Sequence, residues 1–364
     1  MRYPVKERIW TVEPYRPGKP IDEVKRELGL KQVIKLASNE TPFGPSPKVL
    51  RAILKEAKNI NRYPDGSCFL LRKEAAKRLR VRPDRLVFGN GSDEIIVLLI
   101  NAFVGEGDEV VIAKPSFLVY DIASRLAGAA IRAVSLKNFR YDLDGMARAV
   151  TERTKLVIIG NPDNPAGTYV NREQLTAFLQ RIPPQVIVLV DEAYYEYVRA
   201  KDYPDTIRMQ DAFPNLVTTR TFSKLYGLAG LRIGYGIAPK DLVDILNRVR
   251  EPFNVNSVAQ AAALACLDDQ GYYRRKAALV ESQRKVLYAG LRRLGVHFME
   301  SVTNFILVDA GRPSSFVSAA LLKRGVIVRD MDVWGLSQFI RVTIGSAKEN
   351  QIFLKALQRV LKEQ

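Results

Sequence analysis

The sequence contains one histidine and two cysteines, and this scarcity excludes several kinds of chemistry. With His297 as the only imidazole, a catalytic triad built on histidine is not expected. We interpret His297, in the alternating segment GVHFME, as a partly buried structural ring. Cys68 and Cys266 lie far apart and lack metal-ligand spacing. Zinc, most transition metals and a secreted disulfide framework are therefore not expected, and we predict no metal site.

Long apolar runs are also missing. The longest run, from Ile95 to Val104, falls well short of the roughly 18 to 20 residues that span a bilayer, and it is typical of a buried helix. The N-terminal segment MRYPVKERIWTVEPYRPGKP carries charges and prolines where a secretory signal needs a continuous apolar stretch. Together with the low cysteine content, these features predict a cytoplasmic protein.

Three common nucleotide-binding and hydrolase motifs do not occur. Neither the phosphate-binding pattern GxxxxGK[ST] nor the nucleophile pattern GxSxG is present. The turn Gly89-Asn90-Gly91 is followed by Ser-Asp-Glu, which breaks the dinucleotide fingerprint GxGxxG. The sequence therefore gives little support to the hypothesis of a nicotinamide-dependent oxidoreductase.

Acidic residues are the minority charge, since Lys and Arg outnumber Asp and Glu by 56 to 39 and give a formal charge of +17. The basic residues are scattered singly or in short pairs such as Arg292-Arg293. They do not form the clustered stripe with interleaved aromatics of a dedicated nucleic-acid surface. We interpret them as solvated surface and expect no nucleic acid and no membrane as partner.

The pattern of apolar runs indicates an α/β fold. Short apolar runs alternate with longer helical patterns between about residues 85 and 240, which is typical of a parallel sheet covered by helices on both faces. In such folds the loops after the carboxyl ends of the strands collect the ligand-binding residues. The predicted strands are RLVFG, EVVIA, AAIRAV, KLVIIG, VIVLV, LVTTR and RIGYGIA.

The 364 residues suffice for about two domains, and the pattern changes beyond about residue 255. Long helices, Val258–Asp268 and Tyr272–Leu294, precede the strands NFILVDA, VIVRD and FIRVTIG and a closing helix. We predict a large cofactor-binding domain over residues 31–255 and a small α+β domain over residues 256–364. Residues 1–30 are expected to form an N-terminal arm that belongs to the small domain.

Polar side chains follow several of the predicted strands. Asp191 comes directly after VIVLV, with Tyr194 three residues on, and Asn164 lies in the turn NPDNPAGT after KLVIIG. Ser223 and Lys224 follow LVTTR and precede the small-residue loop GLAGLRIGYG. Because the carboxyl ends of parallel strands meet at one edge of a sheet, these side chains are expected to lie together.

A phosphate site is predicted near the same edge. The segment RLVFGNGSDEIIVLL predicts a strand, a glycine-rich turn and a helix, so the amides of Gly91, Ser92 and Asp93 open a helix N-terminus. Such a terminus binds phosphate. Arg232 and Ser223 are candidates to complete the cradle.

Each of these features alone is more often structural, but together they match what pyridoxal 5'-phosphate requires. The amine of Lys224 can form an imine with the cofactor aldehyde. The carboxylate of Asp191 can keep the pyridine nitrogen protonated, which makes the ring an electron sink. The amine that substrate displaces can then carry a proton between the substrate and the cofactor.

The sequence resembles the fold type I, pyridoxal-phosphate-dependent aminotransferases along nearly its whole length. TFSK and AGLRIGYG carry the resemblance to this superfamily. Within it, the sequence is similar to the histidinol-phosphate aminotransferase family. The resemblance implies a large domain with a mostly parallel seven-stranded sheet between helices, plus a smaller α+β domain. The motifs are EPYRPGKP, KLASNETPFGPSP, NRYPDG, FGNGSDE, NPDNPAG, VDEAYYEY and VIVRD.

The resemblance also implies a role for each residue around the cofactor ring. Lys224 would form the imine and Asp191 would pair with the pyridine nitrogen. Asn164 and Tyr194 would bond the phenolic oxygen, and Phe117 would stack on the ring. Lys224, Asp191 and Tyr194 are the expected catalytic residues. The cofactor phosphate would bind Gly91, Ser92, Asp93, Ser223, Arg232 and, across a homodimer interface with shared active sites, Tyr63 of the second subunit.

For the substrates, the resemblance implies transfer of an amino group between L-histidinol phosphate and 2-oxoglutarate, which yields imidazole acetol phosphate and L-glutamate in histidine biosynthesis. Arg341 would grip the α-carboxylate of glutamate, because a planar guanidinium can bind both oxygens. Arg329 and Tyr15 would hold the substrate phosphate, and Asn39 is also expected to bind substrate.

Three residues depart from the family pattern. Asp163 and Ala166 replace the usual Asn and Thr of NPNNPTG, and Phe117 replaces a more usual Tyr. An aromatic amino-acid aminotransferase and a threonine-phosphate decarboxylase remain alternatives on the same fold. A DNA-binding regulator that uses the fold as a sensor is a further alternative, although no helix-turn-helix segment precedes the domain.

Overall fold

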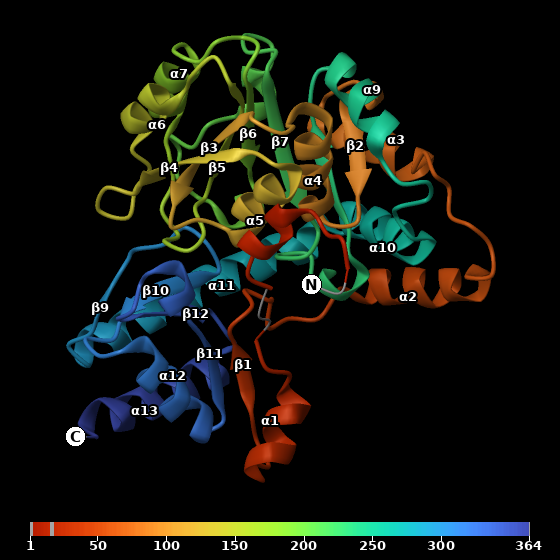
Figure 1. The fold of residues 1–364 in the computed structure, drawn as a ribbon. Helices are drawn as coiled ribbons and strands as arrows, with labels where there is room; N and C mark the ends of the chain where they lie inside the picture. Colours follow the sequence, from red (N-terminus) through yellow and green to blue (C-terminus); the bar gives the residue numbers. More distant parts are fainter. Residues whose placement is uncertain (1–2, 15–17, 364) are drawn as a thin grey trace.

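The computed structural model describes residues 3–14 and 18–363, and its main features are two β-sheets, each packed against helices (Figure 1). The larger sheet has seven strands. Each strand predicted between residues 85 and 238 forms. In spatial order they are β2 (Leu86–Gly89), β8 (Gly234–Ile237), β7 (Leu216–Thr221), β6 (Ile187–Asp191), β5 (Thr154–Gly160), β3 (Glu109–Lys114) and β4 (Ala130–Ser135).

The sheet is mostly parallel, as expected, with one reversed strand. β7, β6, β5, β3 and β4 are parallel to one another, whereas β8 is antiparallel to both β7 and β2. β8 follows β7 after residues 222–233 and runs back beside it. The carboxyl ends of β5, β6 and β7 therefore lie side by side at one edge.

Both faces of the large sheet are buried, which explains its continuous apolar strands. On β5, Leu156 and Ile158 pack into one apolar cluster, whereas Val157 and Ile159 pack into another on the opposite face. Residues from α4 (Ser92–Phe103), α5 (Leu118–Ala127) and α9 (Lys240–Val249) complete the first cluster. Residues from α6 (Leu143–Ala149) and α7 (Arg172–Leu179) complete the second.

The smaller sheet has five strands, two of which, β1 and β9, the sequence analysis did not predict. β1 pairs in parallel with β11, from Ile34↔Val326 to Leu36↔Val328. Residues 34–36, which the sequence analysis assigned to the large domain, thus pair with the small sheet, and we propose that the N-terminal arm extends to residue 36 rather than 30. The order is β1 (Ile34–Leu36), β11 (Val326–Asp330), β12 (Phe339–Thr343), β10 (Phe305–Asp309) and β9 (His297–Phe298).

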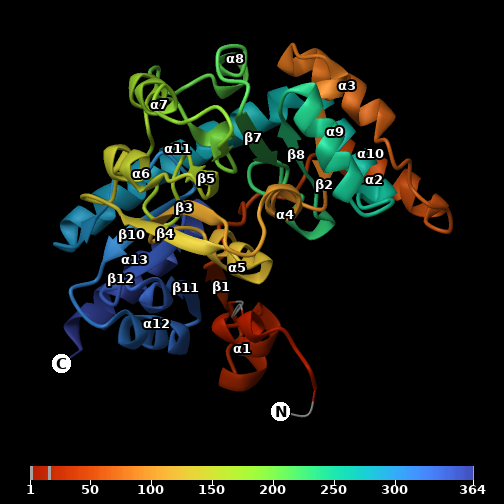
Figure 2. The same ribbon diagram turned by 45° about the horizontal axis from the view of Figure 1, so that its top comes forward.

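In Figure 2 the red β1 again lies beside β11, and the C-terminal domain lies under the large sheet. Val24 of α1 packs with Ile327 of β11. His297 is exposed on β9, so its interpretation as a partly buried ring was wrong, because β9 is an edge strand. The helices of this part are α1 (Ile21–Leu28), α11 (Gln270–Arg293), α12 (Ser314–Lys323) and α13 (Ala347–Lys362).

A third group of helices brings distant parts of the sequence together at the side of the large domain. α10 (Ser257–Asp268) packs against α2 (Pro47–Glu56) and α3 (Phe69–Leu79). Within the described part of the chain, no helix combines the length and apolarity needed to cross a membrane. The remaining elements are short: α8 (Thr206–Met209), η1 (Glu7–Thr11), η2 (Ala57–Asn59), η3 (Pro83–Arg85), η4 (Tyr195–Tyr197), η5 (Ala229–Leu231) and η6 (Asp332–Trp334).

Candidate active site

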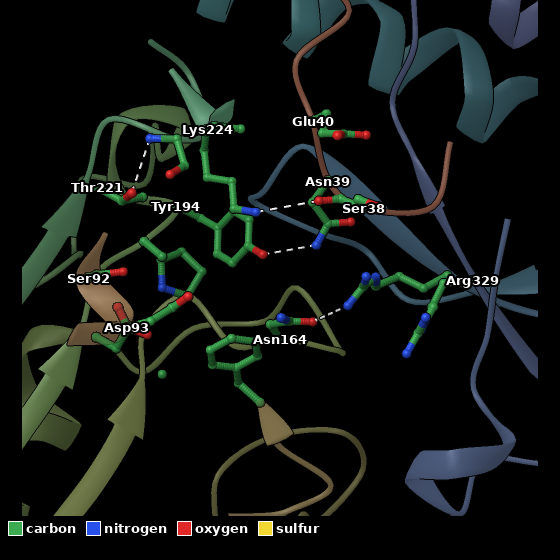
Figure 3. A pocket seen from close by; sticks show the side chains of 18 of the residues that line it. Ser38, Asn39, Glu40, Ser92, Asp93, Asn164, Tyr194, Thr221, Lys224 and Arg329 are labelled. Atoms are coloured by element: carbon green, nitrogen blue, oxygen red, sulfur yellow. Dashed lines mark hydrogen bonds between the residues drawn. The ribbon is translucent and has the colours of Figure 1, made fainter. Parts of the chain in front are cut away.

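A cavity of about 270 Å³ opens at the carboxyl ends of β5, β6 and β7, between the two domains (Figure 3). The structure brings most of the predicted site residues together there. Those that line it are Asn39, Ser92, Asp93, Phe117, Asn164, Asp191, Tyr194, Ser223, Lys224, Arg232, Arg329 and Arg341.

Two of the predicted residues that the structure describes do not line the cavity. Gly91 lies directly behind it, against the Arg232 guanidinium. Tyr63 is 84% exposed and stacks on Phe253, with ring centroids 4.8 Å apart. Its predicted place in the active site of a second subunit is therefore compatible with its position. Tyr15 lies outside the described residues.

Lys224, Tyr194 and Asn39 point toward one another in the cavity (Figure 3). Lys224 Nζ lies 3.4 Å from the carbonyl oxygen of Ser38 and 5.6 Å from the centre of the Tyr194 ring. Asn39 Nδ2 donates to Tyr194 Oη over 2.9 Å. Because Tyr194 accepts this bond, its own hydroxyl hydrogen can be donated to a ligand oxygen.

Asp191 forms the buried floor of the cavity at the end of β6. Its Oδ2 accepts from Tyr120 Oη over 2.8 Å, and its Oδ1 accepts from Thr219 Oγ1 over 3.0 Å. Burial raises the pKa of Asp191 to about 6, while the two hydroxyl donors act in the opposite direction. Around neutral pH the carboxyl is thus mostly ionised and can pair with a protonated ring nitrogen.

The helix N-terminus, Ser223 and Arg232 meet at the other end of the cavity. Arg232 Nη1 lies 3.5 Å from Ser223 Oγ, and its Nη2 lies 3.2 Å from Asp93 Oδ2 in the first turn of α4. Gly91 has a φ of +88°, and a Cβ there would collide with the Arg232 guanidinium. A Cβ on Gly234 would overlap the Ser92 amide. The two glycines thus let strand, helix and arginine close around a small anion.

Two arginines enter the cavity from the small domain. Arg329 on β11 and Arg341 on β12 are directly opposite each other in the antiparallel ladder. Arg341 is buried and donates to Asn164 Oδ1 over 2.5 Å and to the Ala37 carbonyl over 3.0 Å. Like charges directly opposite each other in a sheet are destabilising. A ligand with negative charge at this point would relieve that repulsion.

Sequence reasoning missed several residues that support the site. Trp334 lies with its ring centre 4.8 Å from Arg329 Cζ, and its Nε1 donates to the Ser116 carbonyl over 2.9 Å. It therefore connects Arg329 of the small domain to the residue before Phe117. Tyr120 and Thr219, the two donors to Asp191, were also missed. The available signal for Tyr120 was its spacing of three residues from Phe117, which places both side chains on one face wherever the segment is helical.

Asp163, one of the departures from the family pattern, is buried beside the cavity in the turn after β5. Its Oδ2 accepts from the Ala166 amide over 2.9 Å. Burial raises its pKa to about 7, although the amides of Ala166 and Asn164 and the Tyr141 hydroxyl favour the ionised form. The folded protein thus holds a proton on Asp163 at pH values where the unfolded chain does not.

We predict that Asp163→Asn stabilises the protein at high pH. A raised folded-state pKa contributes stability that is complete below the unfolded pKa of about 4 and lost as pH rises toward 7. Asn has the same shape and cannot ionise, so the variant should gain on the order of 3 kcal/mol at about pH 8 and clearly less at about pH 5. Thermal unfolding of both proteins at the two pH values measures this. An equal gain at both would contradict it.

The lining residues fit pyridoxal phosphate on the geometry alone. Three groups lie at different parts of the cavity wall. They are an amine that can react with an aldehyde, a buried carboxylate that can pair with a basic ring nitrogen, and a cradle that can hold an anion. Phe117 adds an aromatic face, and Asn164 and Tyr194 add neutral hydrogen-bonding groups. The set defines an enzyme that moves amino groups through an aldehyde cofactor.

The chain belongs to the family described as aminotransferase class I and II, whose profile matches residues 31–357. It is 45% identical over 357 residues to the histidinol-phosphate aminotransferase of Moorella thermoacetica, covering 98% of this chain and 92% of that protein. It is 46% identical to histidinol-phosphate aminotransferase 2 of Pseudomonas fluorescens, covering 97% and 96%. The fold is therefore that of the fold type I aminotransferases.

A solved structure supports the same assignment. The crystal structure of histidinol-phosphate aminotransferase from Sinorhizobium meliloti in complex with pyridoxal-5'-phosphate matches with a TM-score of 0.91 and 29% identity, covering 98% of this chain and 97% of that one. Aspartate aminotransferase from Thermus thermophilus matches with a TM-score of 0.86 at 22% identity, which shows a shared fold alone.

Proposed function

We propose that this chain is a pyridoxal-phosphate-dependent aminotransferase of histidine biosynthesis. It converts L-histidinol phosphate and 2-oxoglutarate to imidazole acetol phosphate and L-glutamate. The similarity to histidinol-phosphate aminotransferases over almost the whole chain supports this reaction. Two free, buried cysteines suit a reducing compartment, and we place the enzyme in the cytoplasm.

The observation that carries the proposal is the cross-strand pair Arg329 and Arg341 at the rim of the Lys224 cavity. Both substrates of the reaction are anionic: one carries a phosphate and the other two carboxylates. Arg341, held by Asn164 and Ala37, presents a fixed guanidinium to one anionic group. Arg329, backed by the Trp334 ring, is placed for a second. The site therefore suits a phosphorylated amino donor and a dicarboxylate acceptor in turn.

We assign the chemistry to residues of the large domain. Bound pyridoxal phosphate supplies the carbonyl carbon that receives the amino group and the ring that delocalises the electron pair of the broken C–H bond. Lys224 provides the amine that carries the proton at the reacting carbon. Asp191 would hold the proton on the ring nitrogen, and Asn164 and Tyr194 would bond the ring oxygen. Each half-reaction reuses the same groups, so ping-pong kinetics are expected.

We further propose a homodimer with shared active sites, in which Tyr63 of each subunit reaches the cofactor phosphate of the other. Tyr63 lies among exposed apolar side chains near α2 and α3, and such a surface is typical of a protein interface. Mixing an inactive Lys224 variant with a Tyr63 variant tests whether the sites are shared. The exposed apolar residues of this surface are Leu50, Leu54, Ile60, Tyr63, Phe69, Leu70 and Phe253.

Glutamate formation from 2-oxoglutarate tests the substrate. We expect L-histidinol phosphate to be preferred as amino donor over L-phenylalanine and L-threonine phosphate. Arg329→Leu should lower kcat/KM for histidinol phosphate by about tenfold to a hundredfold, since it removes one charged contact to the phosphate. Preference for phenylalanine, or carbon dioxide release from threonine phosphate, would contradict the proposal and leave the class of enzyme unchanged.

A further inference from the structure

Asp191 is held on both of its carboxylate oxygens by neutral hydroxyl groups. Tyr120 donates to Oδ2 over 2.8 Å, and Thr219 donates to Oδ1 over 3.0 Å. Asp191 and Tyr120 are both buried, with exposed fractions of 6% and 2%. A buried carboxylate is costly unless it is hydrogen-bonded, so these donors decide whether Asp191 remains ionised and how it is oriented.

Helix α5 places Tyr120 against Asp191. Phe117 precedes the first residue of α5, and Tyr120 follows three positions later, so the two rings share a face of the first turn. Their centroids lie 5.5 Å apart with an interplanar angle of 87°. The first turn of α5 thus positions both the Phe117 ring, which lines the cavity, and the Tyr120 hydroxyl, which bonds Asp191.

Gly160 provides the space that this hydroxyl needs. It is the register partner of Asp191 between β5 and β6. A Cβ on Gly160 would lie 3.3 Å from Tyr120 Oη, which is tighter than ordinary contact, and 3.4 Å from Tyr141 Oη. Both tyrosine hydroxyls therefore flank this glycine, but only that of Tyr120 bonds Asp191. Tyr141 Oη accepts from the Gly160 amide over 2.8 Å instead.

We propose that Tyr120 is a positioning residue for the cofactor: its hydroxyl fixes the Asp191 carboxylate and keeps it ionised to hold the proton of the pyridine nitrogen. The inference rests on the proposed role of Asp191. Tyr120 itself touches Asp191 and acts through it.

The surrounding charges make this hydroxyl effective. Burial raises the pKa of Asp191 to about 6 and raises that of Tyr120 well above its usual range, so Tyr120 remains a donor wherever Asp191 titrates. Asp93 on α4 adds a further upward effect on Asp191. Other titratable groups near the pair are Lys224, Arg232 and Tyr194 in the cavity. Tyr141 and Asp163 also contribute to the raised pKa of Tyr120.

Tyr120→Phe keeps the ring and removes only the hydroxyl. With the cofactor bound, Asp191 and the ring nitrogen would share one proton. When the ring nitrogen brings that proton, Asp191 must be ionised, and a proton already on its carboxyl would have to leave to solvent. Affinity therefore falls as pH drops through the pKa of Asp191. Without Tyr120 that pKa rises, and the loss of affinity should move upward by about one to two pH units. Near pH 7 the affinity should fall about twofold to tenfold, because a pKa that rises from about 6 by one to two units reduces the ionised fraction of Asp191 by that factor.

Equilibrium dialysis of the full-length holoenzyme against graded pyridoxal phosphate, from about pH 5 to 9, measures this shift. Thr219→Val removes the other donor to Asp191 without changing α5 and should move the profile the same way. Tyr141→Phe is the matched control, because its hydroxyl flanks the same glycine without bonding Asp191, and its profile should follow the wild type. If Tyr120→Phe does not fold, as judged by circular dichroism, the binding profile of Thr219→Val tests whether the hydroxyl donors keep Asp191 ionised.

A further variant, Asp191→Ala, distinguishes a failure of the positioning role of Tyr120 from a failure of the proposed role of Asp191. If Asp191→Ala weakens cofactor binding but neither Tyr120→Phe nor Thr219→Val changes the profile, the positioning role is wrong. If Asp191→Ala also binds the cofactor like the wild type, the proposed role of Asp191 itself is wrong. A shift of equal size in Tyr141→Phe would overturn the inference too, since it would reflect general loosening of the core.

Discussion

Replacing Lys224 by alanine is expected to abolish amino transfer, with a loss of at least about 10⁴-fold in kcat. Among the described residues that line the cavity, Lys224 is the only lysine. Its amine both attaches the cofactor and carries the proton at the reacting carbon, so no neighbouring group can replace it. Glutamate formation measures the activity, and the absorbance of the bound cofactor shows whether the variant still holds it.

Two controls sharpen this test. Lys224→Arg retains the positive charge next to the Ser38 carbonyl but cannot form the imine, so it should be as inactive as the alanine variant. Mixing Lys224→Ala with Tyr63→Ala, followed by subunit exchange, should restore part of the activity. In a mixed dimer one site has an intact Lys224 and an intact Tyr63. Full activity of Lys224→Ala alone would contradict the assignment, and failure of the mixture would contradict shared sites.

The residues around Lys224 could be predicted because they follow strands. Asp191 comes directly after an apolar run, Asn164 and Lys224 each follow another run within four residues, and the carboxyl ends of parallel strands share one edge of a sheet. The large distances between them along the chain therefore do not matter. The helix N-terminus at Ser92 was equally visible, because a strand, a glycine turn and an apolar helical pattern follow one another without interruption.

The features that escaped prediction depend on pairing over long distances. The direction of β8 is set by its neighbours β2 and β7, not by its own sequence. β1 is only three residues long, and its membership of the small domain depends on pairing with β11. Asn39 adopts a left-handed conformation with φ of 56°, held by bonds to Thr343 and Asn304 of the small domain. No local pattern encodes such contacts.

A buried ion pair behind the site also could not be predicted from the local sequence. Arg220 on β7 and Glu192 after β6 lie 2.8 Å apart, with almost no exposure. The Arg220 guanidinium also lies 3.5 Å from the centre of the Tyr195 ring. In the sequence these residues are neighbours of Asp191 and Lys224 with no distinguishing pattern. Only the register of β6 and β7 shows that they lie together on the opposite side of the sheet from Asp191.

The second large effect is expected at Arg341. Arg341→Leu should lower kcat/KM for glutamate by about 10² to 10³-fold, because the substrate carboxylate loses its charged, doubly bonding partner. The loss should exceed that in Arg329→Leu, since Arg341 is more deeply buried and is already oriented by Asn164 and Ala37. Steady-state kinetics with glutamate as amino donor measure both variants.

Arg341→Lys separates charge from geometry at the same position. An ammonium group retains the charge but cannot bond Asn164, the Ala37 carbonyl and both carboxylate oxygens at once, so at least about a tenfold loss should remain. Cofactor affinity should change little in either variant, because Arg341 is assigned to the substrate carboxylate and bonds Asn164, which is assigned to the cofactor ring. If the lysine variant matched the wild type, Arg341 would act by charge alone. An unchanged KM for glutamate in Arg341→Leu would instead move the carboxylate to Arg329, its neighbour across the strand pair.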